Sequence, residues 1–189
     1  MPLMLTSGTD VENTASSEGN MRITLKKLST VDGMDVHNML QEIPKEENGF
    51  QNGGHGLSYD SYKQWLIRSD QIAKGIDLED WMVPQNTYWL YVDEKPVGMG
   101  KLRLRLTEKL EKDGGNCGYG IVPVYRGCGY GKILLRLLIE EARTLNIGRI
   151  LLTIEKDNPA SLKVALSNGG MIEKSTDELH YVGIKCNAH

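Results

Sequence analysis

Three glycines at alternating positions constrain this chain more than any other feature of its sequence. They are Gly127, Gly129 and Gly131, and they stand where a stretch typical of a β-strand gives way to one typical of an α-helix. Glycine lets a ligand approach the backbone and tolerates dihedral angles that other residues avoid. The first amides of a helix lack partners inside it and lie at the positive end of its dipole. The pattern therefore predicts a phosphate or pyrophosphate site, to which Arg126 and Lys132 add positive charge.

Two other phosphate-binding patterns do not fit this run. The loop GxxxxGK[ST] needs glycine at position 126 and serine or threonine at position 133, where the chain has Arg126 and Ile133. The dinucleotide pattern GxGxxG needs glycine at position 132, where Lys132 stands. The pattern R/Q-x-x-G-x-G/A does fit, at Arg126, Gly129 and Gly131. The sequence thus argues against a nucleotide-binding enzyme that uses ATP or NAD.

Hydrophobic periodicity and chain breakers predict a single mixed α/β domain over residues 21–189. Residues 1–20 are polar and aperiodic, which predicts a flexible tail. Strands are expected at 22–28, 87–92, 96–106, 116–122, 149–155, 171–174 and 179–185. Helices are expected from Ser29 or Thr30 to Ile43, from Ser58 to about Ile72, and at 108–112, 129–145 and 159–167. The segment 44–57 is glycine-rich and is expected to be a loop.

Composition excludes several classes of protein. A net charge of −3 and a pI near 5.8 do not suggest a partner such as nucleic acid. No apolar run approaches the roughly 18 residues of a membrane span, and the first residues do not resemble a signal peptide. The three cysteines and four histidines show no metal-binding spacing, so we expect no metal and a reducing, cytoplasmic setting.

Two stretches together resemble the acetyl-CoA-binding motifs of the GNAT acyltransferase superfamily. The first runs from Ile121 to Gly131, and the second runs from Asn158 to Ser161 and ends in Asn168-Gly169-Gly170. The similarity covers roughly residues 21–185. A further stretch, EIPKEENGF at 42–50, resembles a subset of bacterial predicted acetyltransferases of that superfamily. The resemblance implies a central, mostly antiparallel sheet of six to seven strands flanked by about four helices, with two splayed strands forming an acetyl-CoA cleft.

The resemblance also implies an activity and the residues that serve it. Such proteins transfer the acetyl group of acetyl-CoA directly to a primary amine, here of a small molecule or a peptide. The pantetheine arm would lie between strands 116–122 and 149–155, and the backbone amide of Ile121 would stabilise the oxyanion. The residues implied to bind the cofactor are Tyr119, Ile121, Val122, Arg126, Gly127, Cys128, Gly129, Tyr130, Gly131, Lys132, Asn158 and Ser161. Homodimers are also common among such proteins, so the resemblance implies a possible homodimer here.

Two departures from the family pattern leave the acid and the base open. Many members carry a tyrosine acid at the position that matches Leu166, and some carry a glutamate base where Gly115 and Asn116 stand. The candidates from the sequence for these roles are Glu46, Glu47, Glu155 and Tyr181. The alternative interpretation is a catalytically impaired CoA-binding sensor or interaction module.

Overall fold

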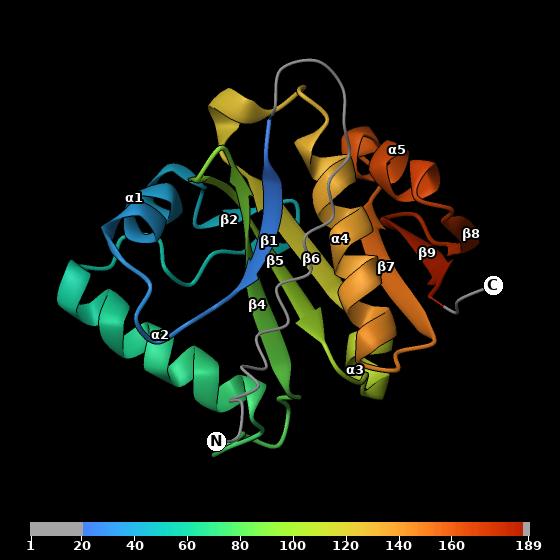
Figure 1. Ribbon diagram of the computed structural model, residues 1–189. Coiled ribbons are helices and arrows are strands. Elements are labelled where there is room, and N and C mark those ends of the chain that lie inside the picture. The colour runs from blue at the N-terminus through green and yellow to red at the C-terminus, as the bar shows by residue number, and fades with distance from the viewer. Residues whose placement is uncertain (1–20, 187–189) are drawn as a thin grey trace, which may run out of the picture.

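The chain folds into a mixed α/β domain in a computed structural model that describes residues 21–186; the predicted tail at 1–20 lies outside them (Figure 1). The strands are β1 (Ile23–Lys27), β2 (Glu46–Glu47), β3 (Phe50–Gln51), β4 (Gln85–Val92), β5 (Lys95–Arg103), β6 (Cys117–Ile121), β7 (Arg149–Glu155), β8 (Met171–Ser175) and β9 (Leu179–Lys185). The helices are α1 (Met34–Glu42), α2 (Tyr59–Ala73), α3 (Glu108–Lys112), α4 (Tyr130–Thr144) and α5 (Pro159–Ser167), with a 3₁₀ turn at Pro123–Tyr125.

Two antiparallel sheets form the centre of the molecule. One has the strand order β1-β4-β5-β6 and the other has the order β7-β9-β8. They meet where β6 and β7 lie side by side without forming a continuous ladder. The mostly antiparallel architecture with splayed strands that the sequence predicts is therefore confirmed.

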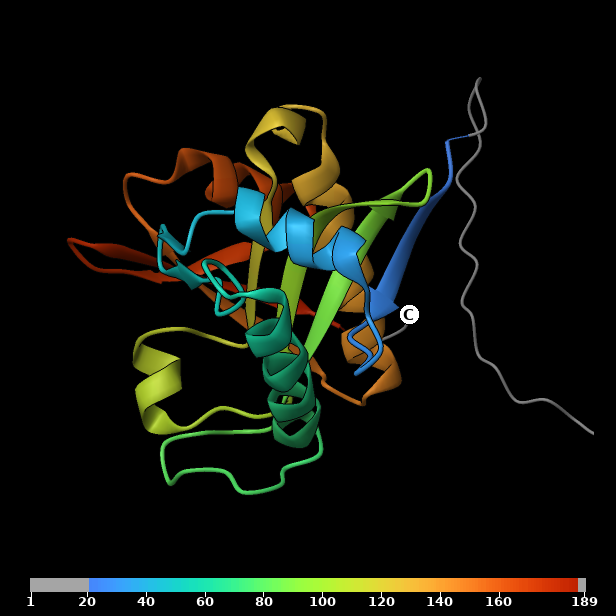
Figure 2. The same ribbon diagram turned by 90° about the vertical axis from the view of Figure 1, so that its left-hand side faces the viewer.

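Helices cover both faces of the central sheet. Helices α1 and α2 lie over one face, and α4 lies over the other beside α5, as the two perpendicular views show (Figures 1 and 2). Each layer buries its own apolar cluster. Trp89, Met99 and Leu40 belong to the cluster under α1 and α2, whereas Leu134 and Leu138 of α4 belong to the second cluster. The sheet is thus held from both sides, and its splayed edge lies between the two layers.

Most element boundaries follow from local signals. The Ser58 hydroxyl accepts from Ser61 N at the start of α2, and the Asn158 side chain accepts from Ser161 N at the start of α5. Both residues act as helix caps, as the sequence predicts. Pro159 occupies the first turn of α5, where its missing amide costs nothing.

Four expectations are wrong in detail. Helix α1 begins at Met34 rather than near Ser29, because Ser29 N donates to the Asp32 carboxylate and forms a turn there. The segment 44–57 is not only a loop, since it contains the small β2–β3 hairpin. Strand β5 ends at Arg103, before the predicted end at Leu106. Leu145, expected in the buried stripe of α4, is 38% exposed because the helix ends before it.

The described part of the chain has neither a membrane-spanning helix nor a cluster of metal-ligating residues. No helix between residues 21 and 186 is long and apolar enough to cross a membrane. Within the same range, His, Cys, Asp and Glu nowhere gather in a group of three or more that could hold a metal ion.

Candidate active site

The phosphate loop, residues 126–132, connects the 3₁₀ turn to α4. Gly127 and Gly129 have positive φ angles of 78° and 83°, which only glycine adopts without strain. A β-carbon built on either would meet no atom within 4 Å, so both positions face open space. Gly129 is the N-cap of α4 and has no side chain to cap it. The first amides of α4 are therefore left to bind a ligand, and an anion suits them.

The splay of β6 from β7 begins at Asn116. Asn116 N donates to Leu151 O at 2.7 Å, and its side-chain oxygen accepts from Leu151 N at 2.9 Å. Gly115 lies so close that a β-carbon on it would stand 2.3 Å from the Leu151 carbonyl oxygen. These two residues therefore lie where the two sheets meet.

Above this junction, β6 presents backbone groups that do not pair with β5 to the gap, and one of them, Ile121 O, accepts from Arg126 Nε at 3.0 Å. Val122 N donates to Val97 O at 3.0 Å, which places the even-numbered residues of β6 in hydrogen-bonded pairs with β5. Residues of an antiparallel strand alternate between facing their partner strand and facing away from it. The amides and carbonyls of Tyr119 and Ile121 therefore point toward β7. This is the backbone for which the sequence predicts a pantetheine partner.

A cavity of about 510 Å³ connects the phosphate loop with the splayed strands. The cofactor residues expected from the sequence that line it are Tyr119, Ile121, Arg126, Gly127, Gly129, Tyr130, Gly131, Lys132, Asn158 and Ser161. Two expected residues do not line it. Val122 is 1% exposed and packs in the cluster under α1 and α2, while Cys128 is exposed but does not line the cavity.

The β2–β3 hairpin forms the opposite wall of the cavity. Its Phe50 ring lies on β6, where β-carbons on Gly118 and Gly120 would stand 3.2 and 3.0 Å from ring atoms. The two strand glycines, which suggested the close approach of a backbone or a ligand, make room for this ring. Phe50 is the only phenylalanine in the chain, but nothing in the sequence indicates which group fills the space.

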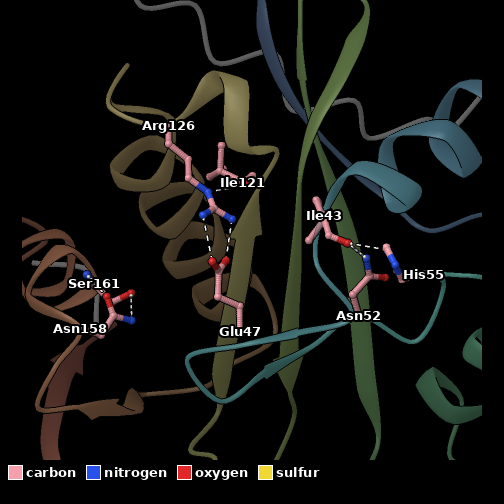
Figure 3. Close-up of polar contacts among 8 residues, drawn as sticks. All are labelled: Ile43, Glu47, Asn52, His55, Ile121, Arg126, Asn158 and Ser161. Atoms are coloured by element: carbon pink, nitrogen blue, oxygen red, sulfur yellow. Dashed lines mark hydrogen bonds and ion pairs between the residues drawn. The ribbon is translucent and has the colours of Figure 1, made fainter.

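A buried asparagine fixes the hairpin to α1. Asn52 is 1% exposed, and its side-chain nitrogen donates to Leu40 O at 2.8 Å and to Ile43 O at 2.9 Å (Figure 3). Its side-chain oxygen accepts from Gly54 N at 3.1 Å. His55 Nδ1 also contacts Ile43 O at 2.9 Å. Asn52 could not be predicted from the sequence, because a loop asparagine carries no local signal that its partners are buried.

Glu47 of the hairpin pairs with Arg126 of the phosphate loop. The Arg126 guanidinium donates to both carboxylate oxygens of Glu47, at 3.1 and 2.6 Å, and its Nε donates to Ile121 O at 3.0 Å (Figure 3). Both side chains line the cavity. The residue expected to bind pyrophosphate and a candidate base are thus bound to each other.

The α5 side of the cavity is polar at its rim. Asn158 donates to Ser161 Oγ at 2.9 Å while it caps the helix, so the two side chains form one cluster that also lines the cavity (Figure 3). The Tyr119 side chain faces the same wall. Burial raises its pKa to about 12, so the phenol stays protonated at neutral pH.

The other proposed acids and bases lie outside this cavity. Glu155 Oε1 stands 3.5 Å from where a β-carbon on Gly49 would be, so it lies beside the hairpin tip. Tyr181 donates to Lys112 O at 2.8 Å and lines a separate cavity of about 260 Å³. Glu46 is exposed, and Leu166 is 43% exposed on the outer side of α5. A tyrosine at 166 would therefore point away from the cavity.

Known proteins share this fold. Residues 55–169 match the acetyltransferase (GNAT) family, whereas no curated protein shows a significant match. A GNAT-family acetyltransferase of Streptococcus pneumoniae is 16% identical, with a TM-score of 0.59, over 87% of this chain and 99% of that one. Campylobacter jejuni N-acetyltransferase PseH in complex with acetyl coenzyme A is 17% identical, with a TM-score of 0.56, over 86% of this chain and 98% of that one.

A third solved structure, of mutant forms of the spermidine/spermine N-acetyltransferase SpeG from Vibrio cholerae, is 16% identical. Its TM-score is 0.57, and the similarity covers 87% of this chain and 95% of that one. Identities this low support the shared fold alone, whereas the family match covers more than half of the chain. The chain therefore belongs to the GNAT acetyltransferase family.

Proposed function

We propose that the protein transfers an acetyl group from acetyl-CoA to a primary amine. The observation that carries this proposal is the continuous cavity between the phosphate loop and the splayed edge of β6. The amides of residues 127–132 would take the pyrophosphate. The backbone of Tyr119 and Ile121 would pair with the pantetheine arm, which would place the thioester beside the hairpin.

The reaction begins with an amine that must lose its proton. A lysine-like amine has a pKa of about 10.4, so roughly one molecule in a few thousand is neutral at pH 7. The neutral nitrogen attacks the thioester carbon, a C–N bond forms, and the carbonyl oxygen becomes an oxyanion. The backbone amide of Ile121, which faces the gap, is our candidate donor to that oxyanion. The C–S bond then breaks, and CoA leaves as the thiolate.

As the C–N bond forms, the attacking nitrogen gains a positive charge, and it loses one proton to a carboxylate to give the neutral amide. Glu47 is the stronger candidate because its carboxylate lines the cavity, and Glu155 is the second because it lies beside the hairpin tip. Tyr181 is a poor candidate, since its hydroxyl is engaged at another cavity. We name no acid, because a thiolate is a stable enough leaving group to depart without one.

Thiol release with acetyl-CoA and a panel of amines tests the proposal. The panel should contain a polyamine, free lysine and a peptide with a free N-terminus, and the acetylated product should be identified by mass. We expect amine-dependent thiol release with at least one of them. Tight CoA binding without turnover on any amine would instead favour the CoA-binding sensor. Absence of CoA binding would reject both.

A further inference from the structure

Arg126 connects two parts of the cavity that serve different substrates in the proposed reaction. Its Nε is anchored on Ile121 O, and its two terminal nitrogens hold the Glu47 carboxylate. The residues are 79 positions apart in the sequence, so the pair joins the phosphate loop to the hairpin. Both terminal nitrogens of Arg126 are therefore engaged by Glu47.

A bound pyrophosphate would compete with Glu47 for the same guanidinium. Arg126 directly precedes the amides of the phosphate loop, and it lines the cavity with them. A guanidinium binds phosphate oxygens in the same two-pronged way as it binds a carboxylate, and a diphosphate carries more charge. The Arg126 and Glu47 side chains are 41% and 40% exposed, so their ion pair is weak enough to be displaced.

The hairpin gives the released carboxylate a place to act. Glu47 and Phe50 are paired across the hairpin, and Phe50 lies directly on β6. The carboxylate of Glu47 thus stands on the hairpin side of the strand that would hold the thioester. While Arg126 occupies both of its oxygens, neither oxygen faces the amine freely. Once Arg126 turns away, the carboxylate can accept a proton.

We propose that Arg126 and Glu47 exchange partners when the donor binds: Arg126 moves to the pyrophosphate, and Glu47 becomes the base for the amine. The inference rests on the proposed function, because it assumes the CoA site and an amine acceptor. In the chemical step, the Glu47 carboxylate takes one proton from the attacking nitrogen as the C–N bond forms and the C–S bond breaks. Glu47 later gives that proton to solvent or to the CoA thiolate.

Equilibrium binding of CoA alone tests the exchange without turnover. Glu47→Gln keeps the shape of the side chain but weakens its hold on Arg126, so CoA should bind about two- to fivefold more tightly than to wild type. Glu46→Gln removes the same charge from the neighbouring exposed position and should leave the affinity within error. Unchanged or weaker binding by Glu47→Gln would overturn the exchange, because a fixed Arg126–Glu47 clamp predicts that result.

The double variant separates the exchange from a general loss of negative charge. Arg126→Gln should weaken CoA binding about three- to tenfold, and adding Glu47→Gln to it should give no further change, because the competition has gone. If Glu47→Gln tightens binding equally in both backgrounds, simple repulsion explains the effect and the exchange is wrong.

Turnover provides the second readout. Glu47→Gln should lower kcat about 100-fold while it raises the affinity for CoA. A residue with only a structural role is not expected to change these two quantities in opposite directions. Raising the pH should partly restore the rate of Glu47→Gln relative to wild type, since hydroxide can then take the proton that Glu47 takes in wild type. A kcat near that of wild type would reject Glu47 as the base. If wild type itself binds no CoA, the proposed function fails, whereas normal CoA binding with no tightening in Glu47→Gln rejects the exchange alone.

Discussion

The phosphate loop and the β2–β3 hairpin face the same cavity, but different kinds of contact hold them in place. The loop is one contiguous stretch, whose shape depends on glycine dihedral angles and on the start of a helix. The hairpin is held by side chains from distant segments, through Asn52, Phe50 and Glu47. The phosphate loop can therefore be recognised from a local sequence pattern. The position of the hairpin depends on contacts between distant residues, which only the folded chain shows.

The largest effect should come from placing a carboxylate in the phosphate loop. We expect Gly129→Glu to weaken CoA binding at least about 100-fold, because like charges brought together at a binding site cost several kcal/mol. Calorimetric titration with CoA measures this. Gly56→Glu is the matched control, since Gly56 also has a positive φ of 77° and open space around it. Equal losses in the two variants would mean that backbone strain, and not the anion site, explains the result.

The contrast between the two regions also explains what the sequence could predict. The order of the main elements, the caps at Ser58 and Asn158, and the anion-binding shape of the loop all depend on residues close in the chain. The hairpin at 46–51 was not predicted, because its two-residue strands are too short for a periodic pattern. The pairing of Glu47 with Arg126 has no local signature.

Removing the buried anchor of the hairpin should give the next largest effect. Asn52→Ala leaves the carbonyls of Leu40 and Ile43 without their donor, and we expect the free energy of unfolding to fall by about 2–4 kcal/mol. Urea unfolding measures this. Gln51→Ala, which truncates the exposed neighbouring side chain, should change it by less than about 0.5 kcal/mol. CoA affinity should not fall in either variant, and a large fall in Asn52→Ala would show that the anchored hairpin itself helps to bind CoA.

Two glycine-to-alanine changes compare the packing around Gly120 on β6 with that around Gly131 at the start of α4. On Gly120, a new β-carbon would stand 3.0 Å from Phe50 and 3.3 Å from Ile43, so the hairpin must shift, at a cost of about 1–2 kcal/mol. On Gly131, the nearest atoms are at 3.7 Å or more, and alanine favours a helix by up to about 1 kcal/mol. Thermal unfolding should therefore rank Gly131→Ala at or above wild type and Gly120→Ala below it. The reverse order would mean that Phe50 is not packed against β6.

The smallest expected effect concerns the pH dependence of hairpin attachment. Lys101 Nζ donates to Gln51 O at 2.6 Å, and burial beside Arg103 lowers the lysine pKa from 10.5 to about 8. The folded protein therefore releases this proton at a lower pH than the unfolded chain does. Between pH 8 and 10.5 the unfolded state binds more protons, so the contribution of Lys101 to stability rises with pH.

The size of that contribution should be at most about 1 kcal/mol, because the side chain is only partly buried. Cys117, whose pKa is raised to about 12 by burial, acts in the opposite direction above pH 9, since the unfolded thiol ionises first. The measurement is thus the difference in unfolding free energy between wild type and Lys101→Met at pH 7.5 and pH 9.5. That difference should shift in favour of wild type at the higher pH. A difference that does not change with pH would mean that Lys101 titrates alike in both states, and that its bond to Gln51 holds the hairpin without any charge penalty.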